Sequence, residues 1–206
     1  MGLISDGTTL LDAGALDSGI ATGAMTLIKT LTASSSGTLS FVNGASGVVI
    51  DGTYKEYVFK IINIHPSASA SFLVGFRDGS TAYDATKTTA YFRAYHQENA
   101  GGGVLAYDAG FDLAQSTDFQ DLTADSVITD NDSGISGTLQ LFDPSSTTFV
   151  KHFLTNINSI KAGSPPEMKD SYTAGYCNVT AAIDGVQFKF DSGNIDSGII
   201  KMYGIV

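Results

Sequence analysis

Residues 186–190 read Val-Gln-Phe-Lys-Phe, so every second side chain is large and apolar. Successive side chains of a β-strand point to opposite faces of a sheet, and this alternation is therefore typical of a strand with one buried face. Working outward along the chain, the same period recurs in 57–62, 72–76 and 199–205, between clusters of Gly, Asp, Ser and Pro. Many short strands joined by turn-forming residues predict an all-β fold. We expect a jelly-roll-like antiparallel β-sandwich with an extended N-terminal arm.

The acidic residues support the same fold class. Of the 21 acidic side chains only Glu56, Glu98 and Glu167 are glutamates, so aspartate dominates. Aspartate favours turns because its short side chain bonds nearby backbone groups, whereas glutamate favours helix interiors. The 23 glycines also suit tight turns. We therefore expect very little helix, limited to one short helix near 113–115 within the irregular region 96–135.

Charge, cysteine content and hydropathy exclude several classes of protein. The net charge is −10 and only Arg77 and Arg93 are arginines, which argues against a nucleic-acid partner because phosphate binding needs clustered basic side chains. Cys177 is the single cysteine, so a disulfide framework is excluded and a buried, inert thiol is predicted. No apolar run reaches the ~18 residues of a membrane span, and the N-terminus lacks the basic region of a signal peptide. We expect a soluble protein made in a cytoplasm, with no membrane insertion.

The N-terminal part of the chain has no aromatic residue before Phe41. A segment poor in bulky side chains cannot build a core of its own. It nevertheless contains short apolar stretches, 10–11 and 25–28, that could each add one strand to the edge of a sheet. We predict an N-terminal arm over 1–36, acting as an anchoring or subunit-exchange segment, followed by a β-sandwich domain over 37–206.

The sequence predicts no catalytic, cofactor-binding or metal-binding residues. The three histidines, His65, His96 and His152, form neither an H-x-H nor an H-E-x-x-H arrangement that would bind a metal. The Gly-x-Ser-x-Gly pentapeptide of serine hydrolases is absent, and no base accompanies Cys177. The many aspartates form accidental pairs, so no single pair of carboxylates is informative. We expect neither enzymatic activity nor a cofactor.

Two aspartate-rich turns have part of the composition of a calcium loop. The segments 130–134 and 191–198 combine closely spaced oxygen ligands with glycine, but neither has the full D-x-D-x-D-G register or a distal glutamate. We interpret both as ordinary turns. Aromatic side chains near loops could form a platform for a sugar ring. The candidates for such a platform are Tyr83, Tyr91, Tyr95 and Tyr107.

Three stretches of the chain resemble recurrent segments of virion proteins of marine tailed phages. They read YKEYVFKIINIHP over 54–66, GTLQLFDPSSTT over 137–148, continued by KHF over 151–153, and FKFDSGNIDSGIIKMYGI over 188–205. Together they span the β-rich part of the chain. The resemblance implies a structural component of the virion and supplies no catalytic residues.

From this resemblance we expect an oligomeric capsid decoration or cement protein on the outer surface of the phage head. The chain is short and has no coiled-coil or fibrous stalk, which favours decoration over a fibre. A trimer is favoured by analogy, because capsid three-fold sites and fibres share that symmetry. The expected partners are further copies of the chain and, through the N-terminal arm, the major capsid protein or another virion protein. The alternative is a receptor-binding tail or head-fibre protein that contacts host surface glycans.

Overall fold

The computed structural model describes residues 3–5, 8–12, 15–16, 24–161 and 163–205. Apart from one 3-10 turn, η1 (Ala109–Phe111), the regular elements of these residues are strands. In chain order they are β1 (Leu3–Ser5), β2 (Thr8–Asp12), β3 (Ala15–Leu16), β4 (Met25–Thr32), β5 (Leu39–Val42), β6 (Glu56–Pro66), β7 (Phe72–Arg77), β8 (Lys87–Gln97), β9 (Gly103–Tyr107), β10 (Gln120–Asp121), β11 (Ile135–Phe142), β12 (Lys151–Lys161), β13 (Glu167–Cys177), β14 (Gly185–Phe190) and β15 (Ile195–Ile205).

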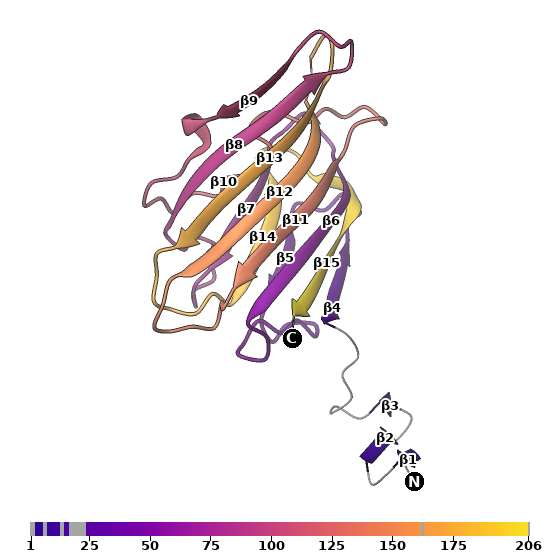
Figure 1. The fold of residues 1–206 in the computed structure, drawn as a ribbon, viewed down its shortest axis with the longest axis vertical. Coiled ribbons are helices and arrows are strands. Elements are labelled where there is room, and N and C mark those ends of the chain that lie inside the picture. Colours follow the sequence, from indigo (N-terminus) through magenta and orange to yellow (C-terminus); the bar gives the residue numbers. More distant parts are fainter. Residues whose placement is uncertain (1–2, 6–7, 13–14, 17–23, 162, 206) are drawn as a thin grey trace.

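The strands form two facing layers, and Figure 1 shows the larger sheet in front of the smaller one. The larger sheet has eight strands in the order β4-β15-β6-β11-β12-β13-β8-β9, and the smaller has four in the order β10-β7-β14-β5. Neighbouring strands are antiparallel in both sheets. The predicted all-β antiparallel sandwich is therefore confirmed.

The connections follow the order of a jelly roll. Counted along the chain, β5, β6, β7, β8, β9, β10, β11 and β14 can be taken as the first to the eighth strand of that fold. The smaller sheet then holds the sixth, third, eighth and first strands side by side, and the larger holds the second, seventh, fourth and fifth. The seventh position is expanded into the meander β11-β12-β13, and β15 and β4 extend the larger sheet beyond β6. This double Greek-key arrangement places both sheets around one core.

A cluster of phenylalanine rings joins the two layers. The ring of Phe59 on β6 lies 5.2 Å from that of Phe41 and 5.8 Å from that of Phe188, between ring centroids. Phe188 in turn stacks on Phe72 at 5.8 Å, and all four rings are buried. Such pairs contribute about 0.5–1.5 kcal/mol each beyond the burial of their surface. The alternating segment 186–190 therefore supplies the centre of the core.

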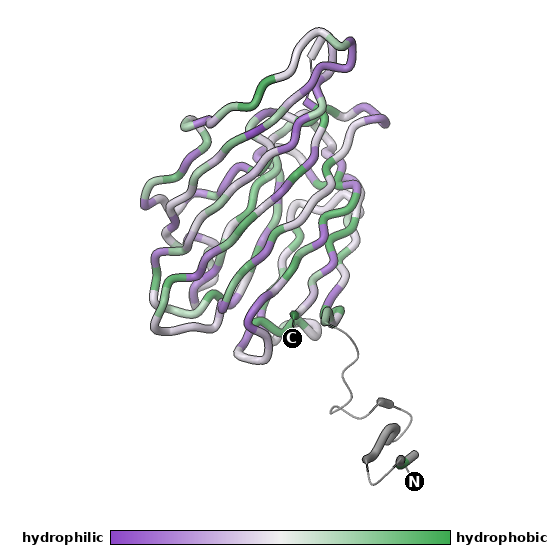
Figure 2. Tube along the Cα trace, viewed as in Figure 1, coloured by the Kyte–Doolittle hydropathy of each residue, from purple (hydrophilic) through white to green (hydrophobic). Residues whose placement is uncertain are grey.

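The alternation continues through the long strands of the larger sheet. In β12, Phe153, Thr155 and Ile157 are buried, whereas His152 and Leu154 on the opposite side are exposed. Figure 2 shows hydrophobic and hydrophilic residues alternating along these strands. A slip of one residue would exchange the two faces, so this pattern fixes the register of pairing.

The C-terminal strand lies inside the larger sheet. β15 pairs with β6 on one side and with β4 on the other. Its Ile200 and Met202 side chains are buried in the core. A strand at this position agrees with the period-2 alternation of 199–205 in the sequence.

The predicted boundary of the N-terminal arm is wrong. Met25–Thr32 forms the edge strand β4 beside β15, so the end of the segment 1–36 belongs to the sandwich, and the prediction of an edge strand at 25–28 is confirmed. Ile28 and Leu31 pack against the core, so aliphatic side chains without any aromatic ring are enough to hold this edge strand. The absence of aromatic residues was therefore a misleading sign.

The earlier part of the arm contains the separate three-stranded sheet β1-β2-β3. The apolar pair 10–11 lies in β2 and pairs within this small sheet, so it does not extend the sandwich. Residues 17–23 of the predicted N-terminal arm lie outside the described residues, so the prediction stays open there.

The short helix expected near 113–115 is also misplaced. The 3-10 turn lies at Ala109–Phe111, and the chain after it runs alongside β8. The N–H of Thr89 donates to the Leu113 carbonyl, and the N–H of Leu113 donates to Thr89 Oγ1. Gln115 also has a φ of 49°, outside the right-handed helical region, so the chain forms no helix at that point.

Truncation of the N-terminus should separate β4 from the segment before it. We expect a chain that begins at Ala24 to melt at the same temperature as the full chain. A chain that begins at Ser36 loses the packing of Ile28 and Leu31 and should be destabilised by about 2 kcal/mol, which lowers its melting temperature by about 5 °C. Thermal unfolding followed by circular dichroism compares the three proteins. Equal melting temperatures for the two truncated chains would show that β4 adds nothing to the sandwich.

Candidate functional site

The outward side of the larger sheet carries the candidate functional surface. On β8, β12 and β13 the side chains that point away from the smaller sheet include large apolar groups in place of charges. We call this surface the aromatic face and define it by Phe92, His152, Leu154, Tyr172, Ala174 and Tyr176. Phe92 and Leu154 are 41% and 45% exposed, which is a high exposure for side chains of this type in the middle of a sheet.

Two aromatic pairs frame a depression on this face. The rings of Phe92 and Tyr172 are stacked, 4.8 Å apart and inclined by only 5°, and those of His152 and Tyr176 lie 6.0 Å apart. Between the pairs the sheet carries the small residue Ala174. The result is two adjoining shallow hollows of about 340 Å³ each, which share Leu154 and Ala174. Large rings around a small floor form a surface that another molecule can fill.

The aromatic face is nearly free of charge. Among the outward side chains of β8, β11, β12 and β13, Asp170 is the acidic one, and it accepts hydrogen bonds from Asn156 Nδ2 and the Tyr172 hydroxyl, both at 2.8 Å. The hydrogen bond to Asp170 raises the pKa of Tyr172, so its phenol stays protonated as the donor. Leu105 on the neighbouring β9, 76% exposed, extends the apolar area. This chemistry suits contact with another apolar surface.

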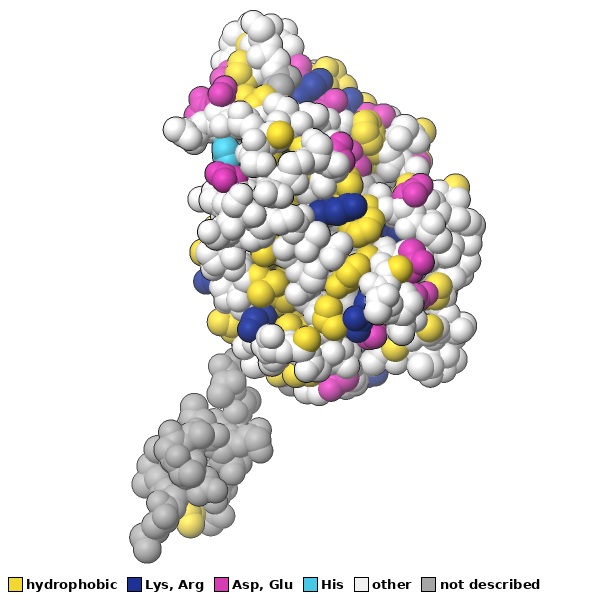
Figure 3. All heavy atoms as spheres, turned by 180° about the vertical axis from the view of Figure 1, so that it is seen from behind, with side chains coloured by type: hydrophobic (Ala, Val, Ile, Leu, Met, Phe, Trp, Pro, Cys, Tyr) yellow, Lys and Arg dark blue, Asp and Glu magenta, His cyan; other side chains and the backbone are white. Residues whose placement is uncertain are grey.

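The opposite side of the molecule differs in charge. Figure 3 shows that face, over the smaller sheet, with basic side chains among the hydrophobic ones. Arg77 forms a bidentate ion pair with Asp184, with both N–O distances at 2.8 Å. Lys189 lies 4.3 Å from the ring centre of Phe119. The nearly uncharged character is thus particular to the outward side of β8, β11, β12 and β13.

Three lysines lie fully buried between the sheets, beneath the aromatic face. Lys151 Nζ donates to the carbonyl of Val179 at 2.8 Å, while Lys87 and Lys169 donate to carbonyls of the segment between β9 and β11. Burial lowers the pKa of each of the three amines, because the charged form loses its hydration. They act as donors that fasten loops to the sheet.

Cys177 lies in register between two of these lysines, Lys87 and Lys151. Burial raises the pKa of its thiol to about 12, against a smaller opposing effect of the two amines. The thiol is therefore protonated at neutral pH and is a poor nucleophile. The prediction that this cysteine is buried is confirmed.

Asp125 forms ion pairs with three basic side chains, one of which is the buried Lys169. Asp125 contacts Arg93 at 2.7 Å and Lys161 at 3.6 Å, and it also bonds the buried Lys169. Burial tends to raise the pKa of Asp125, but the hydrogen bonds and charges of these cations outweigh it and hold the pKa below its usual value. The segment that carries Asp125 is thereby tied to β8, β12 and β13.

Replacing Asp125 by Asn should leave the buried Lys169 without its counter-ion. We expect a loss of about 3 kcal/mol in unfolding free energy near neutral pH. Because the folded-state pKa of Asp125 is depressed, its contribution is present above about pH 4 and is lost as the pH falls through the folded value. The difference between wild type and variant should therefore shrink in acid. Urea unfolding across this pH range measures it.

The matched control for that experiment is Asp143→Asn. Asp143 pairs with Lys55 at 2.8 Å on the surface, where the lysine side chain is 75% exposed, so its loss should cost no more than about 1 kcal/mol. Equal effects of the two substitutions would show that the buried cation does not depend on Asp125.

The tyrosines predicted as a sugar platform do not come together. Tyr91 is fully buried and donates to Ser171 Oγ at 2.6 Å, so its candidacy is wrong. Tyr83 packs on Phe119, Tyr95 lies beneath Arg93, and only Tyr107 stands exposed near the aromatic face. The sequence pattern missed the outward rings because adjacent large residues leave it open which one faces inward.

The two aspartate-rich turns, by contrast, meet at one place. Asp132 from the first turn and Asp196 from the second line the same polar pocket, together with His65. No pattern in the sequence indicates this pairing, because the two turns are far apart along the chain. Among the described residues, no group of three or more His, Cys, Asp or Glu side chains is arranged to hold a metal ion.

Calcium removal should have little effect on stability. The turns at 130–134 and 191–198 bring two carboxylates to the pocket, which falls short of the six to eight oxygens that calcium prefers. We expect EDTA to leave the melting temperature unchanged, and CaCl₂ to restore nothing. A shift of more than about 5 °C between the two conditions would reveal a bound ion.

Comparison of the chain with protein-family models, with curated proteins and with solved structures gave no match. In the described residues no helix is long and apolar enough to cross a membrane.

Proposed function

We propose that this chain is a structural protein of a tailed-phage virion, a non-enzymatic decoration or cement protein on the outside of the head. The resemblance of 54–66, 137–148 and 188–205 to phage virion segments motivates the proposal. A jelly-roll sandwich is a fold that viral capsid proteins use, although the same fold serves other functions. The observation that carries the proposal is the aromatic face, which suits contact with protein.

A second copy of the chain is the proposed occupant of the aromatic face. Copies that each carry a net charge of −10 repel one another, so stable self-association requires a surface without charge. The aromatic face offers such a surface, and its rings and aliphatic groups match the composition of interface cores. A trimer around a three-fold axis is the assembly we favour.

The N-terminal part is proposed to contact the capsid. β4 forms one edge of the larger sheet, and its outer backbone edge is open to a further strand among the described residues. Met25 and Leu27 on this strand are exposed. Addition of a strand from the major capsid protein, or from another virion protein, would pair this edge.

Placing a charge in the aromatic face should weaken self-association. We expect Phe92→Lys to weaken it at least about tenfold, since a lysine in the contact would have to be desolvated. Phe149→Lys is the matched control, because Phe149 is 70% exposed in the turn before β12 and makes the same change in charge. Light scattering after gel filtration measures the oligomer, and circular dichroism verifies the fold. A wild-type chain that stays monomeric, or equal association of the two variants, would remove the aromatic face as the interface.

The position on the particle is tested on purified virions. Labelled antibody should decorate the head, and the copy number should be comparable to that of the major capsid protein. A few copies located at the tail or at a fibre would favour the alternative, a receptor-binding protein. Absence of the chain from virions would reject both.

A further inference from the structure

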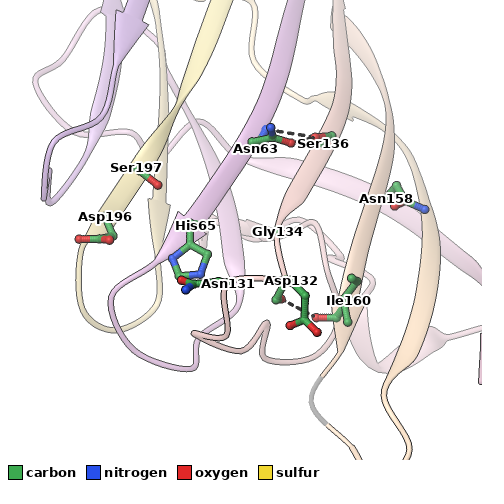
Figure 4. Close-up of a pocket in the computed structure, with 11 residues that line it drawn as sticks. Asn63, His65, Asn131, Asp132, Gly134, Ser136, Asn158, Ile160, Asp196 and Ser197 are labelled. Atoms are coloured by element: carbon green, nitrogen blue, oxygen red, sulfur yellow. Dashed lines mark hydrogen bonds between the residues drawn. The ribbon is translucent and has the colours of Figure 1, made fainter. Parts of the chain in front are cut away.

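A polar pocket of about 500 Å³ opens on the outward side of the larger sheet, where loop 130–134 lies next to β6, β11, β12 and β15. Figure 4 shows that its walls come from segments far apart in sequence and surround one hollow. The lining side chains that matter for recognition are Asn63, Asn131, Asp132, Asn158, Asp196 and Ser197. Its volume falls within the ~300–1,000 Å³ typical of small-molecule sites.

Irregular pairing of the strands builds this hollow. Asn63 has a φ of 46°, and β6 shifts register against both of its neighbours, β11 and β15, close to this residue. Gly198 on β15 passes so near β6 that a Cβ atom there would lie 2.5 Å from the carbonyl oxygen of Asn63. Bulges of this kind redirect side chains and are frequent beside functional sites. The wall is therefore a specific feature of the backbone.

One part of the wall is held by internal hydrogen bonds. The N–H of Asn63 donates to Ser136 Oγ at 3.1 Å, and the hydroxyl of Ser136 donates to Asn63 Oδ1 at 3.3 Å (Figure 4). His65 Nε2 lies 3.1 Å from the carbonyl oxygen of Asp130, which ties the loop to β6. These contacts position the loop over the strands before any ligand arrives.

The other part of the wall has free hydrogen-bonding capacity. The side chains of Asn131, Asp132, Asp196 and Ser197 form no hydrogen bond or ion pair with any other described residue. They belong to the loop and to β15, on different sides of the hollow (Figure 4). Two carboxylates, an amide and a hydroxyl are thus available to one ligand.

The lining excludes several classes of ligand. It holds no Lys or Arg, and its two carboxylates would repel a phosphate, a sulfate or an acidic sugar. Ile160 is the aliphatic residue among the lining side chains, so there is little surface for a lipid. Neutral hydroxyl groups fit, because each can both donate and accept a hydrogen bond. Carboxylates accept hydrogen bonds from them, and amide N–H groups donate hydrogen bonds to them.

We propose that this pocket binds a neutral, hydroxyl-rich ligand, such as a hexose or an N-acetylhexosamine unit. Asp132 and Asp196 accept hydrogen bonds from sugar hydroxyls, and Asn131 and Asn158 orient the ring from the loop and from β12. The site goes beyond a role in the virion and does not depend on that role. It also replaces the loop tyrosines as the point of contact with glycans.

Direct titration of the intact chain tests the proposal. The neutral probes are glucose, galactose and N-acetylglucosamine, both as free sugars and as units of neutral trisaccharides, and the charged probes are glucose 6-phosphate and N-acetylneuraminic acid. Saturation-transfer NMR and calorimetry should detect at least one neutral probe, with charged probes at least about tenfold weaker. Tighter binding of a trisaccharide than of its free sugar identifies a glycan as the source of the ligand, and equal binding identifies a free sugar.

The variants Asp132→Ala and Asp196→Ala assign the binding to the pocket. Each should weaken binding about tenfold through loss of a charge-assisted hydrogen bond, with no change in melting temperature because neither side chain has a partner within the described chain. Asp84→Ala, at an exposed aspartate outside the pocket, is the matched control and should bind like wild type. Failure of every neutral probe at millimolar concentration, wild-type binding by both pocket variants, or a saturable response to CaCl₂ alone that Asp132→Ala abolishes would overturn the proposal.

Discussion

Phe59 packs between Phe41 and Phe188, and this contact across the sandwich sets how the two sheets face each other. The sheets differ in width, eight strands against four, so the smaller sheet cannot cover the whole inner side of the larger one. The segment between β9 and β11 closes the remainder and brings backbone carbonyls that need donors once they are buried. Lys87 and Lys169 supply those donors from the strands. The mismatch in width therefore explains why a largely apolar interior also holds buried polar side chains on β8, β12 and β13.

The aromatic face lies on the side of the larger sheet that points away from this interior. On β8, β12 and β13 the core-facing positions are occupied by other side chains, among them lysines and hydroxyl groups. The outward rings of these strands therefore do not contribute to the core. Exposed rings in a sheet cost solubility, and an unpaired apolar surface favours aggregation. The stacked pair Phe92 and Tyr172 is the part of this surface that the proposed second copy would cover. The net charge of −10 also limits which partner can cover this pair of rings.

The sequence pattern predicted strands well but could not predict the layer or the face for each residue. Period 2 identifies β12 and β14, in which buried positions alternate with more exposed ones, but it cannot decide between adjacent large residues such as Tyr91 and Phe92. Lys169 sits at an inward position of the pattern, and only the loop above it explains a buried charge there. The pocket could not be predicted at all. It brings Asp132 close to Asp196 where β6 shifts register against both β11 and β15, and such irregularities have no periodic signal.

The pocket and the aromatic face lie on the same side of the larger sheet, and their spacing affects what an assembly can do. Asn156 belongs to the hollow beside Phe92, and Asn158, the next outward residue of β12, lines the polar pocket. Copies joined through the aromatic face would therefore hold their pockets at the rim of the contact, at fixed separations. A single open site lined by exposed groups binds a neutral sugar weakly, because water competes for every hydrogen bond. Several such sites on one rigid assembly convert later contacts with a polymeric glycan into intramolecular events, which raises avidity by about 10²–10⁴ without any new interaction. The proposed self-association and the proposed ligand binding would in this way use separate residues and be coupled in their effect.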